Sequence, residues 1–285
     1  MDDFEARRKH LVRLAYQMLG SVSDADDIAQ ETWIRWQGAD QSAISNASAW
    51  LTKTATNLAI DRLRQLQRSR EEYIGEWLPE PLLDSDPGER AEIDESVSIA
   101  LMRTLQNLRP EERAAFLLHD VFGYAFVDVA SILDLRSAHC RQLASRARAR
   151  LAVDRSPTRA RVSDVERLTD AFFRAIETAD LSALESVLAD DVMLHSDGGG
   201  KAAAARKPIE GRSAVARFFD RIYRAHEGPI RRRSSWFNSA PGALVFEGDS
   251  PVTAFQFDCI DGQITTIYAQ RNPDKLSVIA PSLDS

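Results

Sequence analysis

The apolar residues of this chain change their spacing along its length, and this change constrains the fold more than any other feature. In the first segment Leu11, Leu14 and Met18 recur at the three-and-four spacing of an amphipathic helix. Near the C-terminus, runs such as 253–258 and 264–270 alternate as strands do, between turn residues. Helices that precede an antiparallel sheet indicate all-α and α+β domains in one multidomain chain.

Breaks rich in proline, glycine and acidic residues divide the 285 residues, a length that allows two or three small domains. The predicted modules are helical over 1–72, helical again over 93–153, and α+β over 164–285. An acidic linker with prolines over 73–92 and a shorter linker over 154–163 separate them. Four dipeptides of the α+β domain are predicted turns, namely Gly228-Pro229, Pro241-Gly242, Gly248-Asp249 and Asp261-Gly262.

Charge is distributed unevenly along the chain. The net charge of −7 and the pI of about 5.4 argue against a nonspecific nucleic-acid binder, which is normally basic. Locally, however, the stretch 136–150 holds five arginines and no acid, whereas 76–92 holds six acids against Arg90. A chain with one basic helix can bind DNA locally while its bulk charge discourages indiscriminate binding.

Cysteine usage and the N-terminus bear on the compartment. Cys140 and Cys259 lie far apart and lack metal-ligand spacing, so two reduced thiols are expected. The N-terminus is charged and has no apolar export signal, and no apolar stretch reaches the roughly 20 residues that span a bilayer. We expect a cytoplasmic protein that contacts no membrane and needs no cofactor or metal.

The arginine-rich stretch lies in a pattern typical of a helix-turn-helix: a short helix over 126–133, a tight turn at Asp134-Leu135 and a helix over 137–151. The second helix of such a unit presents its N-terminal half to base edges and its flanking cations to phosphates. A solvated basic helix is the alternative. The residues predicted to contact DNA are Arg136, Ser137, His139, Arg141, Gln142, Ser145, Arg146 and Arg148. Arg141 and Gln142 suit bidentate base contacts, and the last two arginines suit phosphates.

A second candidate surface lies on the predicted helix that begins near Ser48. An amide, a carboxylate and cations recur there at about four-residue spacing, outside the apolar face. Such groups can hold a base that has left the duplex, and a tryptophan can stack on that base. An ordinary solvated surface is the alternative. The residues are Trp50, Lys53, Asn57, Asp61 and Arg64.

These segments resemble the extracytoplasmic-function sigma factors of RNA polymerase. DADDIAQETWIRWQ (24–37) and AWLTKTATNLAIDRLRQ (49–65) resemble their region two. LRPEERAAFLLHDVFGYAFVDVASILDL (108–135) and CRQLASRARARL (140–151) resemble their region four. One position departs from the family pattern, because Asp134 stands where the turn usually has glycine. Aspartate tolerates left-handed conformations better than most residues, so we expect the turn to survive.

The resemblance implies partners and roles for these segments. It implies that 27–35 docks on core RNA polymerase, largely on the beta-prime clamp coiled coil, with the beta flap as a second polymerase contact. It implies that Asn57, Asp61, Arg62 and their neighbours melt and read the −10 promoter element, and that 136–148 reads the −35 element. The residues implied for polymerase binding are Asp27, Gln30, Glu31, Trp33 and Arg35.

The C-terminal domain resembles the SnoaL-like branch of the NTF2-like fold, a cone-shaped α+β domain. WLPEPL, DGGGK and NPDKL resemble motifs of the sigma-factor subgroup fused to such a domain. The resemblance implies that the domain regulates the sigma factor in cis and that the linker packs against it. The residues implied for this contact are Trp77, Pro79, Pro81, Leu82, Asp197, Gly198, Gly199, Gly200, Lys201, Asn272, Pro273, Asp274, Lys275 and Leu276.

Free relatives of the SnoaL-like fold include cyclases and isomerases with acid–base residues in a pocket. His195, with Asp197 and with Trp236 or Tyr268 nearby, could imitate such a pocket. A histidine at a strand end is more often structural, so we expect no enzyme activity, while binding of an unidentified small molecule stays open. DGGGK either cradles an anion or forms a tight hairpin in which Asp197 and Lys201 contact the sigma portion.

The sequence therefore predicts a sigma factor that directs core polymerase to a bipartite promoter and is modulated in cis by its last domain. Two alternatives stay open. A ligand-responsive helix-turn-helix regulator would bind an operator without polymerase. A SnoaL-type cyclase or isomerase with a DNA-binding appendage would depend on His195 for turnover.

Overall fold

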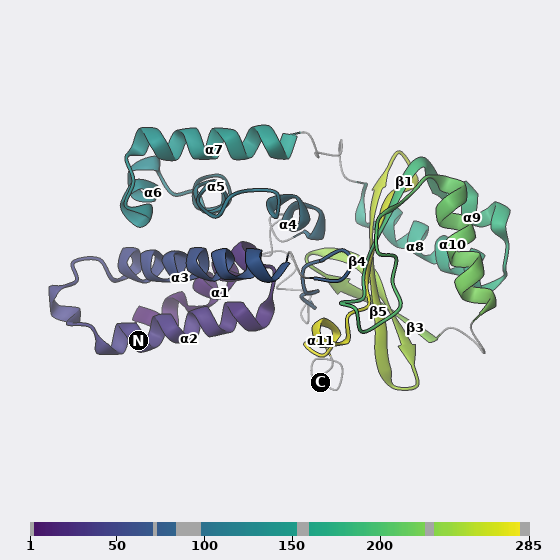
Figure 1. The fold of residues 1–285 in the computed structure, drawn as a ribbon, viewed down its shortest axis with the longest axis horizontal. Helices are drawn as coiled ribbons and strands as arrows, with labels where there is room; N and C mark the ends of the chain where they lie inside the picture. The colour runs from purple at the N-terminus through teal and green to yellow at the C-terminus, as the bar shows by residue number, and fades with distance from the viewer. Residues whose placement is uncertain (1–2, 71–72, 84–97, 153–159, 226–230, 280–285) are drawn as a thin grey trace. The chain divides into compact units, whose positions relative to one another are not determined.

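A computed structural model describes most of the chain (Figure 1). Contacts define two compact units, a helical one from Met1–Glu72 with Leu101–Arg155, and an α+β one from Tyr73–Ala100 with Ser156–Ser285. The acidic part of the linker and the predicted turn at Gly228-Pro229 lie outside the described residues. In the described part, no helix is long and apolar enough to cross a membrane. The described residues are 3–70, 73–83, 98–152, 160–225 and 231–279.

Three helices form the first helical module. α1 (Asp3–Leu19) ends before Gly20, whose φ of 73° glycine adopts without strain. α1, α2 (Val22–Gly38) and α3 (Ala47–Arg70) pack together through apolar side chains at helical spacing. A 3-10 turn, Gln41–Ala43, lies between α2 and α3. Buried residues of this core include Leu11, Leu14, Met18, Leu51, Ala55 and Ala59.

The second helical module contains the predicted helix-turn-helix. α5 (Pro110–Phe116) begins with proline, which needs no N–H at that position, and continues as a π-helix over Leu117–Val121. α6 (Phe126–Leu133) and α7 (Ser137–Ala152) follow, and Figure 1 shows α6 at one end of α7. Asp134 joins them in the left-handed conformation, at φ 54° and ψ 41°. The turn thus survives without glycine, as expected.

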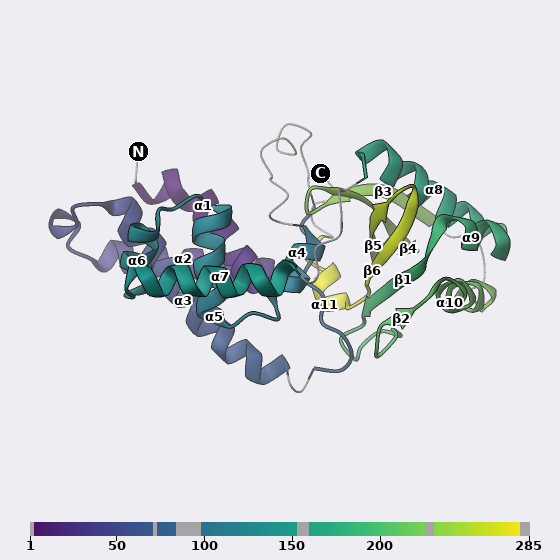
Figure 2. The ribbon, with the colours of Figure 1, turned by 90° about the horizontal axis from the view of Figure 1, so that it is seen from above.

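In the α+β unit, six strands of the described part form one sheet in the order β2-β1-β6-β5-β4-β3. β1 and β6 pair in parallel, and the other neighbours pair antiparallel. Figures 1 and 2 show α8, α9 and α10 on one side of the sheet and α11 on the other. The elements are α8 (Val162–Glu177), α9 (Leu181–Val187), β1 (Leu188–Asp197), β2 (Ile209–Glu210), α10 (Arg212–Arg224), β3 (Arg231–Phe237), β4 (Ala240–Glu247), β5 (Ser250–Ile260), β6 (Gln263–Gln270) and α11 (Pro273–Leu276).

The sheet face under α8, α9 and α10 is apolar and filled by aromatic rings. Leu194 and Ile267 pair across β1 and β6 and belong to one buried cluster with Phe257 of β5. Phe172 of α8 meets the rings of Phe219 and Phe257 edge-on, with centroids 5.0 and 5.2 Å apart. The predicted fold class, helical domains followed by an α+β domain, is confirmed.

The other face of the sheet carries polar residues, because strand side chains alternate between faces. His195 pairs with Tyr268 in register on this face, beside Asp197 and its partner Gln270. The linker segment 73–83 and α11 contact these residues. α4 (Ile99–Leu105) begins here too, since its first residue clusters with Leu78 and Tyr268, and the boundary between the two units falls within this helix.

One of the predicted turns is misplaced. β3 and β4 are joined at Asn238-Ser239, with φ values of 51° and 62°, whereas Pro241-Gly242 lies inside β4. Asn238 holds this turn in place by bonding to the linker through its side chain. Gly248-Asp249 and Asp261-Gly262 form the turns predicted at those positions.

Candidate nucleic-acid interface

The outer side of α7 gathers most of the residues predicted to contact the −35 element. α7 buries Cys140, Leu143 and Ala147, which turns the intervening positions outward. Arg141, Gln142, Ser145 and Arg146 line an open hollow on this side. Arginine and glutamine can each make two hydrogen bonds to base edges in a major groove. Exposed residues on this side are Arg136, His139, Arg141, Gln142, Ser145 and Arg146, and Ser137 is partly buried.

Two other arginines of α7 face acids of the same module. Arg148 donates hydrogen bonds of 2.7 and 3.1 Å to the two carboxylate oxygens of Asp120. Arg150 donates at 2.6 Å to Glu112, whose side chain is 1% exposed. Such charge-assisted bonds fix the direction of α7 relative to α5. Arg148, predicted to bind phosphate, therefore has a structural partner here.

α3 carries the residues of the second predicted surface, with Arg62 on the side that faces α2 and Lys53 and Arg64 on the side that faces the second helical module. Trp50 is half-buried and leans against Trp36, with ring centroids 5.4 Å apart at 55°. Arg62 forms a 2.7 Å ion pair with Asp24 of α2, which ties α3 to its neighbour. Asp61, Arg62 and Arg64 are exposed, while Lys53 and Asn57 are half-buried. The six residues predicted for the −10 element thus lie along one helix.

Two cations of α3 pair with acids of the second helical module. Lys53 lies 2.5 Å from Asp134 in the turn of the helix-turn-helix. Arg64 lies 2.6 Å from Glu111 of α5 and 2.9 Å from Asp61. Burial acts to raise the pKa of Glu111, but the hydrogen bond and the charge of Arg64 outweigh it and lower that pKa below its usual value. The carboxylate of Glu111 is therefore ionised at neutral pH.

A tyrosine beside the first of these ion pairs joins the same two modules. The Tyr124 hydroxyl lies 3.3 Å from the Thr52 hydroxyl and 3.1 Å from Nε2 of His10. His10 also meets the ring of Phe122 edge-on at 5.0 Å. Burial, together with the charges of arginines one turn before and after it on α1, lowers the pKa of His10 to about 4. Sequence reasoning missed these contacts, because no local pattern marks them.

The outward side of α2 carries the residues implied for polymerase binding. Trp33 and Ile34 are 41% and 50% exposed, which is unusual for such large apolar side chains. Glu31 and Arg35 form an ion pair of 2.9 Å along the helix. Asp27 and Gln30 are exposed beside them. An exposed strip of apolar and charged side chains suits contact with another protein.

In the α+β unit, the three motifs that resemble the fused subgroup meet at one buried carboxylate. Asp197 is fully buried and accepts hydrogen bonds from the Tyr73 hydroxyl at 2.6 Å, the Leu78 N–H at 2.8 Å and the Lys275 ammonium at 2.7 Å. Lys275 also donates to the Leu78 carbonyl and lies 4.0 Å from the centroid of the Trp77 ring. Burial and Asp197 raise the pKa of Tyr73, so its hydroxyl stays protonated and donates.

The glycine turn after β1 packs closely against the NPDKL motif. A Cβ on Gly199, whose φ is 59°, would lie 2.3 Å from the Asn272 side-chain amide, so the position excludes larger residues. Asn272 caps α11 by accepting from the N–H of Asp274 at 3.0 Å. Lys201 forms a 2.5 Å ion pair with Asp274, within the same domain. The predicted contact of Lys201 with the sigma portion stays a prediction.

The other end of the described linker adds to the edge of the sheet. Leu82 and Asn238 exchange hydrogen bonds: the Leu82 N–H donates to the Asn238 side-chain oxygen at 3.1 Å, and the Asn238 N–H donates to the Leu82 carbonyl at 2.9 Å. Leu83 forms a β-bridge with Phe237. Pro79 and Pro81 are buried between these two ends. The linker thus contacts the α+β domain along its described length.

The predicted pocket is only partly assembled. His195 stacks on Tyr268, with centroids 5.8 Å apart, and its Nδ1 lies 3.0 Å from Glu76 of the linker. Trp236 pairs with Pro241 on the face that α8, α9 and α10 cover, so it lies on the opposite side of the sheet. The predicted grouping of Trp236 with His195 is therefore wrong.

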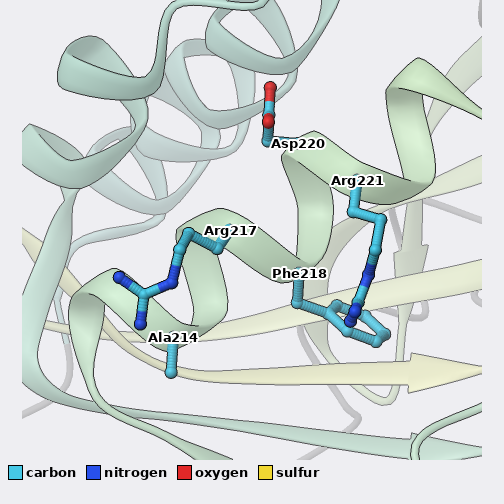
Figure 3. Close-up of a pocket in the computed structure, with 5 residues that line it drawn as sticks. All are labelled: Ala214, Arg217, Phe218, Asp220 and Arg221. Carbon is cyan, nitrogen blue, oxygen red and sulfur yellow. The ribbon is translucent and has the colours of Figure 1, made fainter.

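A separate hollow lies on the outer side of α10. Figure 3 shows its lining side chains along one helix, and Asp220 among them pairs with Arg224 at 2.9 Å. Its lining contains no histidine and no pair of carboxylates, so it offers no acid–base couple. The lining residues are Ala214, Arg217, Phe218, Asp220 and Arg221.

The sequence matches two protein families within the helical modules. Residues 4–69 match Sigma-70 region 2, which includes α2 and nearly all of α1 and α3. Residues 98–151 match Sigma-70, region 4, which includes α5, α6 and nearly all of α7. We therefore refer to the first and second helical modules as region two and region four.

Similar proteins extend this match to the whole chain. ECF RNA polymerase sigma factor SigJ of Mycobacterium tuberculosis is 34% identical over 97% of this chain and 93% of its own length. Probable ECF RNA polymerase sigma factor SigI of the same species is 32% identical over 65% of each chain. The crystal structure of the SigJ protein superposes with a TM-score of 0.75 at 32% identity, covering 96% of this chain and 97% of that one. The chain belongs to the extracytoplasmic-function sigma factors, which direct RNA polymerase to promoters.

Proposed function

We propose that the outer side of α7 reads the −35 element in the major groove. The observation that carries this proposal is the exposed row of α7, which lies opposite the buried side of the helix. Bonds from Arg148 to Asp120 and from Arg150 to Glu112 hold α7 in this orientation. Arg141 lies over the ring of Phe126, 5.6 Å from its centroid, which orients its guanidinium. The residues assigned to this role are Arg136, Ser137, His139, Arg141, Gln142, Ser145, Arg146 and Arg148.

The helix α3 is assigned to the −10 element, which must be melted before it is read. Base-specific recognition of a single strand needs a stacking partner, hydrogen-bonding groups and cations for the backbone. Trp50 supplies the stacking partner, and Asn57 and Asp61 supply the hydrogen-bonding groups. Three basic side chains supply the positive charge for the backbone. The cations are Lys53, Arg62 and Arg64.

Core RNA polymerase and promoter DNA are the partners of a sigma factor. We assign the outward side of α2 to the beta-prime clamp coiled coil, supported by the exposure of Trp33 and Ile34. Region four is assigned to the beta flap. The proposed place of action is the cytoplasm, where the polymerase works.

The α+β domain is assigned a role in cis, through the linker between regions two and four. Support comes from the Asp197 network, in which a buried carboxylate and a buried ammonium both bind linker backbone or side chains. Restraint of the linker limits how far the two DNA-reading regions can separate, which biases the equilibrium between promoter-competent and other states.

The alternatives from the sequence lose their basis. A helix-turn-helix regulator that acts without polymerase would have no use for α1, α2 and α3. In a sigma factor these helices form region two. Sigma factors are not enzymes, although the fold of the α+β domain also occurs among enzymes. In the described part of that domain, phenylalanines fill the helix-covered side of the sheet, so nothing there favours a small-molecule site.

Run-off transcription with core polymerase and a mapped promoter tests the DNA-reading proposal. We expect Arg141→Ala to lower transcription about tenfold or more, because a bidentate base contact contributes about 1–3 kcal/mol. Arg221→Ala, on the exposed side of α10, removes the same charge elsewhere and should leave transcription unchanged. Equal transcription from the two variants would remove α7 as the −35 reader.

A further inference from the structure

In this structure, acidic residues of region four pair with the proposed −10 surface of α3. Lys53 pairs with Asp134 at 2.5 Å, and Arg64 pairs with Glu111 at 2.6 Å. The two cations lie eleven positions apart in one helix, a distance of about 16 Å along its axis. Region four therefore holds α3 at two separate points.

A third contact lies beside the first ion pair. Tyr124 bonds Thr52, the neighbour of Lys53 in sequence, and also His10 of α1. Together the contacts are two ion pairs, the hydrogen bonds of the Tyr124 hydroxyl, and the edge-on contact between the His10 and Phe122 rings. We call them the closing interface, which consists of His10, Thr52, Lys53 and Arg64 from region two and Glu111, Phe122, Tyr124 and Asp134 from region four.

The chemistry of this interface matches that of a nucleic-acid backbone. Lysine and arginine bind carboxylates and phosphates with the same N–H groups. The Asp134 carboxylate, 2.5 Å from the Lys53 ammonium, takes up one of its donors and repels a phosphate that approaches the same cation. Region four thus places two anions where α3 would bind the backbone of an unpaired strand.

Asp134 is an unexpected residue for a purely structural turn. Its φ of 54° suits glycine best. Its side chain is 72% exposed, so packing does not explain it. The ion pair with Lys53 is the contact that a glycine would lose.

We infer that region four acts as an intramolecular competitor of promoter DNA for α3, with Asp134 and Glu111 taking the place of DNA phosphates. This inference rests on the proposed −10 role of α3. The four paired side chains are 37–72% exposed, and exposed ion pairs contribute little to stability. The state in which region four pairs with α3 is therefore only slightly more stable than the separated state, and binding of polymerase or DNA can shift the equilibrium away from it.

The test uses the full chain without polymerase and a fluorescein-labelled single strand that carries the −10 element of a mapped promoter. We expect Glu111→Gln combined with Asp134→Asn to bind this strand about fivefold more tightly than a control, as loss of two exposed ion pairs predicts. The control, Glu5→Gln combined with Asp128→Asn, removes the same charge from exposed acids of the helical unit. Fluorescence anisotropy gives the affinities.

Asp134→Gly is a second variant, because glycine accommodates the turn and the fold is kept. It should also bind more tightly than wild type. Binding by the double variant equal to that of the control overturns the inference. The proposed function is tested separately by Lys53→Ala in holoenzyme: reduced permanganate reactivity of the −10 region supports the role of α3, and unchanged reactivity removes it.

Discussion

The two units each contain an aspartate–lysine pair of similar length in very different surroundings. Asp197 and Lys275 lie 2.7 Å apart, with side chains 0% and 7% exposed. Asp134 and Lys53 lie 2.5 Å apart, with side chains 72% and 37% exposed. Because water screens the second pair and not the first, the first suits permanent attachment of the linker, and the second suits a contact that must be released.

The largest expected effect follows from breaking the buried pair. Asp197→Asn leaves Lys275 buried without its charged partner, which should destabilise the α+β unit by about 3–5 kcal/mol. Hydrogen–deuterium exchange of residues 73–83 should accelerate, and run-off transcription should change because the linker is released. Lys201→Ala breaks an exposed pair of the same domain (57% and 62% exposed) and should cost about 1 kcal/mol or less. Unchanged exchange in Asp197→Asn would show that the buried pair does not hold the linker.

An intermediate effect on stability is expected from protonation of His10, because this residue lies at the closing interface but is partly buried. Its pKa falls from 6.5 to about 4 in the folded protein, so the unfolded chain binds more protons between these values. Stability should therefore be full above pH 6.5 and fall as the pH drops towards 4, by at most about 1.4 kcal/mol per pH unit. Urea titrations of wild type and His10→Gln between pH 5 and 7 measure this, and parallel pH dependences would contradict it.

The smallest effect concerns the exposed pair. Asp134→Asn should change the free energy of unfolding by less than about 1 kcal/mol. The difference should vanish near 1 M salt, where the screening length is only about 3 Å. Urea unfolding followed by far-ultraviolet circular dichroism at low and high salt checks both. A loss of several kcal/mol would make this pair as structural as the buried one and would end the contrast between them.

Much of the helical unit could be predicted because its signals are local. Apolar spacing, Pro110 at the start of α5 and the tolerance of Asp134 for a left-handed turn all act within a few residues. The turn between β3 and β4 was predicted incorrectly, since Pro241-Gly242 is the stronger local signal. Asn238 occupies the turn instead and bonds to Leu82 of the linker, a contact between residues distant in sequence.

The candidate surfaces also differ in whether local sequence or contacts between distant residues determine them. The outer row of α7 follows from helical periodicity, so sequence alone could place Arg141 and Gln142 together. The partners of α3 could not be predicted, because Lys53 and Asp134 are 81 positions apart and either would pass for a solvated charge. Trp236 was grouped wrongly because the face on which a strand residue lies depends on the register between strands.

Burial of the linker constrains how this protein can be shortened. Leu78 is fully buried, Ile99 is 4% exposed, and both pack with Tyr268 of the sheet. A polypeptide cut before the sheet would leave these side chains in water, where exposed apolar surface promotes aggregation. Truncated forms would therefore report on solubility as much as on transcription, and over evolution the linker and the sheet are expected to be gained or lost together.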